Sequence, residues 1–114
     1  MTRRILIIED TPTIARVQKH IAQKVGYEAD IAGSLAEAKE LISKHNYFCA
    51  VVDFILPDAP TGEAVPCTIE ADIPTIVMTG NLDETTRNIV EKHPIIDYIT
   101  KENKQAYQYL EKQL

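Results

Sequence analysis

Four apolar stretches of this sequence each end in a residue that can do chemistry. Glu9 and Asp10 follow the first stretch, and Asp53 ends the run Ala-Val-Val-Asp. Thr79 and Lys101 follow two later stretches. Each of these residues alone reads as an ordinary turn or surface residue. Their joint placement at the ends of separate stretches is hard to obtain by chance, so the pattern indicates one shared site.

The stretches themselves have the composition of strands in a covered parallel sheet. Residues 5–8 and 50–52 are apolar without polar alternation, which is typical of strands buried on both faces, and the fourth strand is predicted over residues 75–78. Residues 27–32 form a weaker, mixed strand suited to an edge, and residues 95–100 form a fifth strand. We therefore predict five strands.

A first helix is predicted directly after the first strand. Thr11 suits the N-cap and Pro12 the first helical position. Gly26 is placed to end this helix in a left-handed conformation. The apolar stripe that should face the sheet recurs at helical spacing and consists of Ile14, Val17, Ile21 and Val25.

The remaining helices are less uniform. Residues 34–37 form a capping box that begins a second helix. Its expected inner face consists of Leu35, Ala38, Leu41 and Ile42. Pro66 falls inside the next candidate helix, so we predict a short or irregular third helix near residues 66–71. Residues 83–92 and 103–114 are predicted as the last two helices.

The strand–helix alternation predicts an α/β fold, a doubly wound five-stranded parallel sheet with right-handed crossovers. In the flavodoxin-like strand order 2-1-3-4-5, ligands bind beyond the carboxyl ends of the first and third strands. Glu9, Asp10 and Asp53 would meet there. Two carboxylates about 4 Å apart repel by roughly 4 kcal/mol at an effective dielectric constant near 20. Mg²⁺, held by these acids and a loop carbonyl such as that of Ile55, would relieve this repulsion.

Length and composition narrow the class of protein. The 114 residues suit one compact domain, and no apolar run is long enough for a membrane span or a secretory signal. We expect a cytoplasmic protein, and the net charge of −5 argues against direct nucleic-acid binding. Cys49 and Cys67 match neither a disulfide scaffold nor a metal knuckle, so buried, inert thiols are expected. The histidines, expected at the solvated surface, are His20, His45 and His93.

Taken together, these residues resemble the receiver domains of two-component response regulators. The resemblance covers essentially the whole chain. It is carried by Glu9-Asp10, by Val-Val-Asp-Phe-Ile-Leu-Pro-Asp around Asp53, by Thr79-Gly80 and by Tyr-Ile-Thr-Lys at residues 98–101. It implies one receiver domain over residues 1–114, either alone or as the N-terminal part of a longer chain.

The resemblance also implies a role for each residue at the predicted edge. Asp53 would accept a phosphoryl group from a histidine kinase or a phosphotransfer protein. The ligands of Mg²⁺ or Mn²⁺ would be Glu9, Asp10, Asp53 and the backbone carbonyl of Ile55. The phosphoryl oxygens would be bound by Thr79, Gly80 and Lys101. Tyr98 would be the aromatic switch that turns inward when Thr79 is drawn to the phosphate.

At the level of the whole domain, the resemblance implies a bacterial signalling module that is not an enzyme. A homodimer through the fourth helix, fifth strand and fifth helix is compatible with it.

Three features depart from the family pattern. Glu102 replaces the usual proline after the lysine, and Glu9 replaces the more frequent aspartate. The interval from Asp53 to Thr79 is shorter by about one helical turn. Ile55 and Asn81 lie where side chains tend to tune loss of the phosphoryl group.

Three other classes of protein share some features of this sequence. A flavodoxin-like FMN protein needs a Ser/Thr/Gly-rich phosphate loop after the first strand, where this chain has Glu-Asp-Thr-Pro-Thr. A haloacid-dehalogenase-type phosphatase places its nucleophilic aspartate after the first strand with a second aspartate two residues on, a pattern that residues 9–12 do not match. A degenerate receiver would bind partners without phosphorylation. The intact set of Asp10, Asp53, Thr79 and Lys101 argues against this third class.

Overall fold

The computed structural model describes residues 3–79, 95, 97–100, 110 and 114. Strands and helices alternate along the chain from β1 to β4. In chain order the described elements are β1 (Arg4–Ile8), α1 (Pro12–Lys24), β2 (Glu28–Ala32), α2 (Leu35–Lys44), β3 (Cys49–Val52), α3 (Ala64–Glu70), β4 (Thr75–Thr79) and β5 (Asp97–Thr100).

The five strands form one sheet in the order β2-β1-β3-β4-β5, and every pairing is parallel, as predicted. Ile8 at the end of β1 pairs with Ala32 of β2 and with Val52 of β3. Thr79 at the end of β4 pairs with Thr100 of β5. The carboxyl ends of the strands therefore line up along one edge of the sheet.

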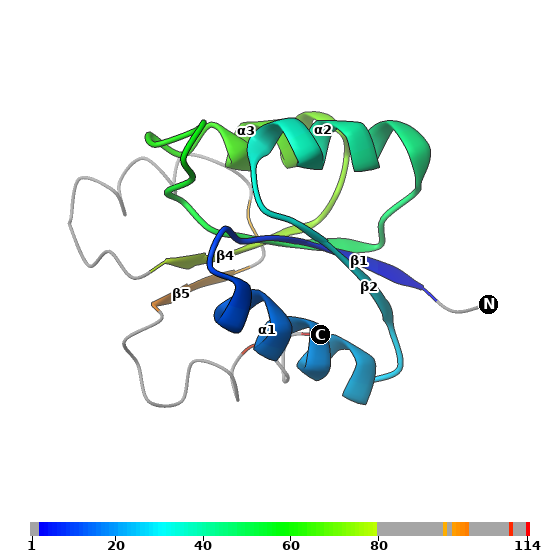
Figure 1. Ribbon diagram of the computed structural model, residues 1–114. Coiled ribbons are helices and arrows are strands. Elements are labelled where there is room, and N and C mark those ends of the chain that lie inside the picture. Colours follow the sequence, from blue (N-terminus) through cyan, green and yellow to red (C-terminus); the bar gives the residue numbers. More distant parts are fainter. Residues whose placement is uncertain (1–2, 80–94, 96, 101–109, 111–113) are drawn as a thin grey trace.

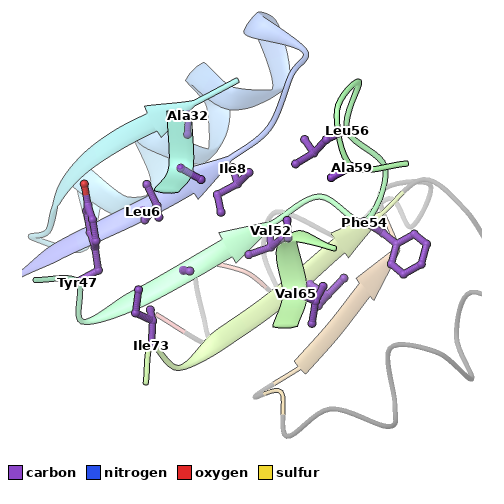
Figure 2. Packing of buried hydrophobic residues seen from close by; sticks show 14 residues of the cluster. Leu6, Ile8, Ala32, Tyr47, Val52, Phe54, Leu56, Ala59, Val65 and Ile73 are labelled. Carbon is purple, nitrogen blue, oxygen red and sulfur yellow. The ribbon is translucent and has the colours of Figure 1, made fainter. Parts of the chain in front are cut away.

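Helices cover both faces of the sheet, with α2 and α3 on one face and α1 on the other (Figure 1). Alternate residues of β1 supply the two cores. Leu6 and Ile8 belong to the cluster under α2 and α3, whereas Ile5 and Ile7 belong to the cluster under α1. Figure 2 shows the first cluster, in which Val52 of β3 lies close to Ile8 of β1. The apolar strands are buried on both faces, which is why they lack polar alternation.

Of the predicted apolar stripe of α1, only Ile21 is buried as expected, and the other three positions are wrong. Val17 is 42 % exposed and Val25 is 40 % exposed, and Ile14 is only half-buried. The residues that α1 buries are Ala15, Gln18, Ile21 and Ala22. The small side chains of Ala15 and Ala22 let the helix backbone approach the sheet closely, so the helix is rotated away from its bulkier valines.

The ends of α1 and α2 largely follow their predicted caps. Gly26 has a φ of +102°, the left-handed conformation that favours glycine after a helix. Ser34 accepts a hydrogen bond from the backbone N–H of Glu37 over 3.2 Å, as a capping box requires. The Glu37 carboxylate reaches the N–H of Gly33 rather than that of Ser34. Of the predicted inner face of α2, Ala38 is buried, and the partly buried residues packed on the core are Leu35, Leu41 and Ile42.

The third helix is short, as predicted, but it begins two residues earlier than expected and ends one residue earlier. It spans Ala64–Glu70, and Pro66 is its third residue. The N–H groups in the first turn of a helix have no intrahelical partner, so the missing N–H of Pro66 breaks no bond there. Pro66 therefore lies in the first turn of a helix and does not interrupt one.

Several other predictions have mixed outcomes. Cys49 is buried, and burial raises the pKa of its thiol to about 11, whereas Cys67 is only half-buried. His20 and His45 are exposed as predicted. The predicted helix at residues 83–92 and His93 lie outside the described residues, as does most of the predicted helix at 103–114. Within the described ranges, no helix has the length and apolarity to cross a membrane.

Candidate metal centre at the carboxyl edge of the sheet

The backbone fixes two acidic residues directly beyond the paired strands. The N–H of Asp53 donates to the carbonyl of Ile8 over 2.8 Å, and the N–H of Glu9 donates to the carbonyl of Ala32 over 2.9 Å. Each acid thus extends the sheet hydrogen-bonding pattern by one residue past its strand. Both side chains are nearly excluded from solvent, Glu9 at 2 % exposure and Asp53 at 8 %.

These two acids meet a third one, Asp10. One carboxylate oxygen from each of Glu9, Asp10 and Asp53 can be chosen so that all three lie within 4.8 Å of one another. Asp10 is exposed and the other two are buried, so the cluster is open to solvent on one side. Hard oxygen donors of this kind are the ligands that Mg²⁺ takes in proteins. The three residues that the sequence predicts as metal ligands are thus brought together, and their chemistry fits that cation.

Short-range hydrogen bonds hold the carboxylates at this edge. Oε2 of Glu9 accepts a bond from the N–H of Thr11 over 3.2 Å. Thr11 precedes α1 as predicted but makes no side-chain capping bond, so Glu9 performs part of that function. Oδ1 of Asp53 accepts a longer bond of 3.4 Å from the N–H of Ile55. Each acid is therefore oriented by the backbone two residues further along the chain.

The loop after Asp53 is anchored by its neighbours. Phe54 is buried, and its ring occupies the space beside Gly62, where an added Cβ would clash with the ring. Gly62 also has a φ of +84°, so glycine is required there on both counts. Ile55, between the buried Phe54 and the buried Leu56, is 45 % exposed. The loop thus presents an apolar side chain to solvent two residues from Asp53.

The remaining predicted site residues are only partly described. β4 ends at Thr79, two residues beyond the Val77 that pairs with Val52, so the backbone of Thr79 lies at the same edge as Asp53. The backbone of Tyr98 is in β5, paired with Val77 of β4. Residues that lie outside the described ranges are Gly80, Asn81, Lys101 and Glu102. The predicted roles of these residues, and of the Thr79 and Tyr98 side chains, remain predictions.

One contact at this edge was not foreseen from the sequence. Asp58, five residues after Asp53, accepts hydrogen bonds from the N–H groups of Leu35 over 2.8 Å and Ala36 over 3.0 Å. These bonds lower the pKa of the Asp58 carboxyl group. No local sequence signal marks this contact, because helix caps are recognised from neighbouring residues and Asp58 lies more than 20 residues away.

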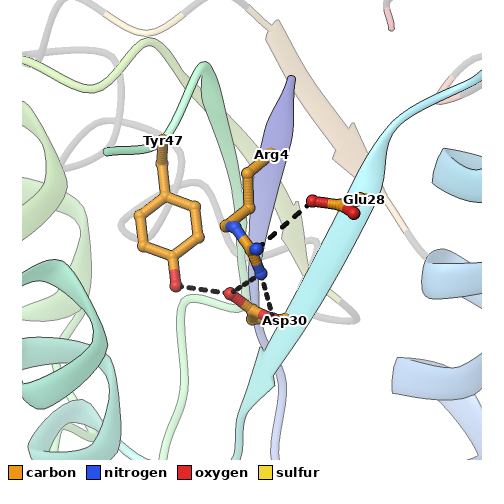
Figure 3. A network of polar contacts seen from close by, with 4 residues as sticks. All are labelled: Arg4, Glu28, Asp30 and Tyr47. Atoms are coloured by element: carbon orange, nitrogen blue, oxygen red, sulfur yellow. Dashed lines mark hydrogen bonds and ion pairs between the residues drawn. The ribbon is translucent and has the colours of Figure 1, made fainter. Parts of the chain in front are cut away.

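The opposite edge of the sheet also carries acids, in a different arrangement (Figure 3). Nη1 of Arg4 donates to both carboxylate oxygens of Asp30 over 2.9 Å, and Nη2 of Arg4 donates to Glu28 over 3.2 Å. The hydroxyl of Tyr47 donates to Oδ2 of Asp30 over 2.8 Å. Here a guanidinium group lies between two acids, whereas at the carboxyl edge three acids converge.

Comparison with known proteins agrees with the fold. Residues 5–111 match the family model of the response regulator receiver domain. The chain therefore belongs to the receiver domains of response regulators. The parallel sheet in the order β2-β1-β3-β4-β5 is the architecture that the strand–helix alternation predicted.

Individual relatives point the same way. The chain is 30 % identical over 102 residues to the transcriptional regulatory protein SrrA of Staphylococcus aureus, a match that covers 89 % of this chain and 42 % of SrrA. It thus spans less than half the length of that relative. Among solved structures, it is similar in fold to a CheY-like receiver domain protein from Methanospirillum hungatei, with a TM-score of 0.80 and 24 % identity over 99 % of this chain and 97 % of the other. The phosphorylated cyanobacterial phytochrome response regulator RcpA gives a TM-score of 0.85 at 17 % identity, over 98 % and 91 % of the two chains.

Proposed function

We propose that this domain accepts a phosphoryl group on Asp53 from the phosphohistidine of a sensor histidine kinase or a phosphotransfer protein. The observation that carries the proposal is the convergence of Glu9, Asp10 and Asp53 at the carboxyl edge of a receiver fold. In the transfer, the phosphorus–nitrogen bond of the donor breaks, and a bond forms between phosphorus and a carboxylate oxygen of Asp53. The product is an aspartyl phosphate, and the donor imidazole leaves.

The transfer would depend on Mg²⁺ or Mn²⁺. The ligands that this chain offers are Glu9, Asp10, Asp53 and the backbone carbonyl of Ile55. A bound divalent cation supplies positive charge that offsets the acids and the oxygens of the incoming phosphoryl group. Without such charge, an anionic donor would be repelled from a cluster of three carboxylates.

Asp53 is suited to the role of nucleophile by its position. Its backbone N–H is fixed to Ile8, and the N–H of Ile55 binds its Oδ1, so the carboxylate is held at the end of a rigid strand. Phosphoryl transfer depends mainly on positioning and charge stabilisation. A carboxylate fixed next to a cation site meets both needs, and Asp10 leaves that site open to solvent on one side.

Residues at and beyond the ends of β4 and β5 would complete the proposed site. Thr79, Gly80 and Lys101 bind the phosphoryl oxygens, the first by its hydroxyl group, the second by its backbone N–H and the third by its charge. Movement of Thr79 toward the phosphate draws Tyr98 inward, which is the two-state switch that carries the signal. The readout surface would be the face of the fourth helix, fifth strand and fifth helix, also the proposed site of homodimerisation. The domain works in the cytoplasm, on protein partners rather than on nucleic acid.

Chemical phosphorylation tests the proposal. We expect incubation with acetyl phosphate and Mg²⁺ to give an adduct that is stable in acid and cleaved by hydroxylamine. Asp53→Asn removes the nucleophile and should abolish it. Asp72→Asn is the matched control, because Asp72 is an exposed acid in the loop before β4, away from the cluster. An adduct that persists in Asp53→Asn would contradict the assignment of the phosphoacceptor.

A further inference from the structure

The loop that follows Asp53 contains a tight turn with buried flanks. The N–H of Leu56 donates to the carbonyl of Ala59 over 3.2 Å, and the N–H of Ala59 donates back to the carbonyl of Leu56 over 3.1 Å. Both side chains belong to the core cluster under α2 and α3 (Figure 2). The turn is therefore locked into the core at its two ends, and Asp58 lies within it.

Asp58 joins this turn to the first turn of α2. The first three N–H groups of a helix need partners outside the helix ladder. In α2 the N–H groups of Leu35 and Ala36 donate to the two oxygens of Asp58, and the N–H of Glu37 donates to Ser34. Two of the three partners thus come from a loop that begins at Asp53, more than 20 residues away, and only one comes from the local cap.

We propose that Asp58 is a positioning residue that couples the order of the loop at residues 53–59 to the order of the first turn of α2. The coupling acts on the site because Ile55, whose N–H binds the Asp53 carboxylate and whose carbonyl is a proposed metal ligand, lies between Asp53 and the locked turn. This consequence for the metal rests on the proposed function. By thermodynamic linkage, a cation that orders the loop also stabilises the first turn of α2.

Amide hydrogen exchange, measured by NMR without metal, tests the coupling itself. Asp58→Ala should speed exchange at Leu35 and Ala36 by about two- to thirtyfold, the range expected for loss of a helix cap. It should also speed exchange at Leu56 and Ala59. Ser34→Ala is the matched control, because it removes a cap of the same helix without touching the loop. It should speed exchange at Glu37 and leave Leu56 and Ala59 unchanged.

Two results would overturn the coupling. One is unchanged exchange at Leu56 and Ala59 in Asp58→Ala. The other is an equal increase at these two amides in Ser34→Ala, which would make the effect a general loosening of α2. Neither result depends on whether the domain binds a metal, so this experiment judges the coupling separately from the proposed function.

A Mg²⁺ titration followed by amide chemical shifts tests the consequence for the site. Asp58→Ala should weaken Mg²⁺ binding by about fivefold, the lower end of coupling between linked sites. Asp58→Asn keeps one acceptor oxygen, so its Mg²⁺ affinity should lie between those of Asp58→Ala and the wild-type protein. Ser34→Ala should bind Mg²⁺ with the affinity of the wild-type protein. Equal affinities in the unchanged protein and in Asp58→Ala would overturn the positioning role. Absence of Mg²⁺ binding by the unchanged protein would instead overturn the proposed metal site.

Discussion

The two edges of the sheet place acidic residues in opposite ways. At the amino edge, Asp30 is bridged by the guanidinium group of Arg4 and by the hydroxyl of Tyr47, so its charge is balanced locally. At the carboxyl edge, oxygens of Glu9, Asp10 and Asp53 converge within 4.8 Å. Opposite charges in contact, as at the amino edge, stabilise the folded structure. Like charges that converge, as at the carboxyl edge, repel one another and favour binding of a divalent cation, whose charge is higher than that of one basic side chain.

Metal binding should show the largest difference between the edges. Asp10→Asn removes one charged ligand from the cluster, so we expect Mg²⁺ affinity to fall more than tenfold. The stability of the metal-free protein should not fall, because like-charge repulsion decreases. Isothermal titration calorimetry and urea unfolding measure the two quantities. Asp30→Asn, at the amino edge, is the control and should leave Mg²⁺ affinity unchanged. Equal losses of Mg²⁺ affinity in Asp10→Asn and Asp30→Asn would contradict the assignment of the metal site to the carboxyl edge.

Folding stability should show the reverse pattern. Arg4→Met removes the partner of Asp30 while keeping an apolar side chain, and we expect a lower midpoint of urea unfolding. Glu28→Gln changes an acid that is more exposed than Asp30 and should lower that midpoint less. If Glu28→Gln lowered the stability to urea and Arg4→Met did not, the contact of Arg4 with Asp30 would not be the stabilising one.

The pH dependence of stability gives a smaller effect. Burial raises the pKa of Asp30, but hydrogen bonds from Tyr47 and Arg4 outweigh it and leave the pKa below its usual value. A group with a lowered pKa in the folded state stabilises the protein above its unfolded pKa, and this contribution disappears as pH falls through the folded pKa. Asp30→Asn should therefore flatten the acid side of a plot of unfolding free energy against pH. An acid side as steep as before would show that Asp30 makes no such contribution.

The smallest expected effect concerns two exposed apolar side chains, one near each edge of the sheet. Ile55 near Asp53 is 45 % exposed, and Phe48 next to β3 at the amino edge is 44 % exposed. If apolar Ile55 slows attack by water on the aspartyl phosphate, Ile55→Asn should shorten the phosphoryl lifetime by a few-fold, roughly the scale of one polar contact. Phe48→Asn should leave the lifetime unchanged. An unchanged or longer lifetime in Ile55→Asn would contradict this role.

The sequence predicts the parts of the molecule that depend on local pattern. Residues 5–8 and 50–52 read as buried strands because no polar residue interrupts them, and this fixed where Glu9 and Asp53 would lie. The parallel strand order then brought these acids together without further information. Gly26 and Ser34 were predicted for the same reason, since helix caps depend on neighbouring residues.

The contacts that the sequence does not predict depend on distant residues. Asp58 binds the start of α2 across more than 20 residues of chain, and Arg4 meets Asp30 only because β1 and β2 pair in register. The inward face of α1 also depends on the sheet beneath it, which accommodates Ala15 rather than Val17. Periodicity alone favours the larger apolar residues and misses the closer packing that alanine allows.

Asp53 is the residue that we propose takes the phosphoryl group. The most direct test is to phosphorylate the protein with acetyl phosphate and Mg²⁺, reduce the aspartyl phosphate with borohydride, and locate the resulting homoserine by mass spectrometry. We predict homoserine at position 53, and none when Mg²⁺ is chelated. Homoserine at any other aspartate would show that Asp53 is not the phosphoacceptor, and homoserine at position 53 without a divalent cation would show that the transfer needs no metal.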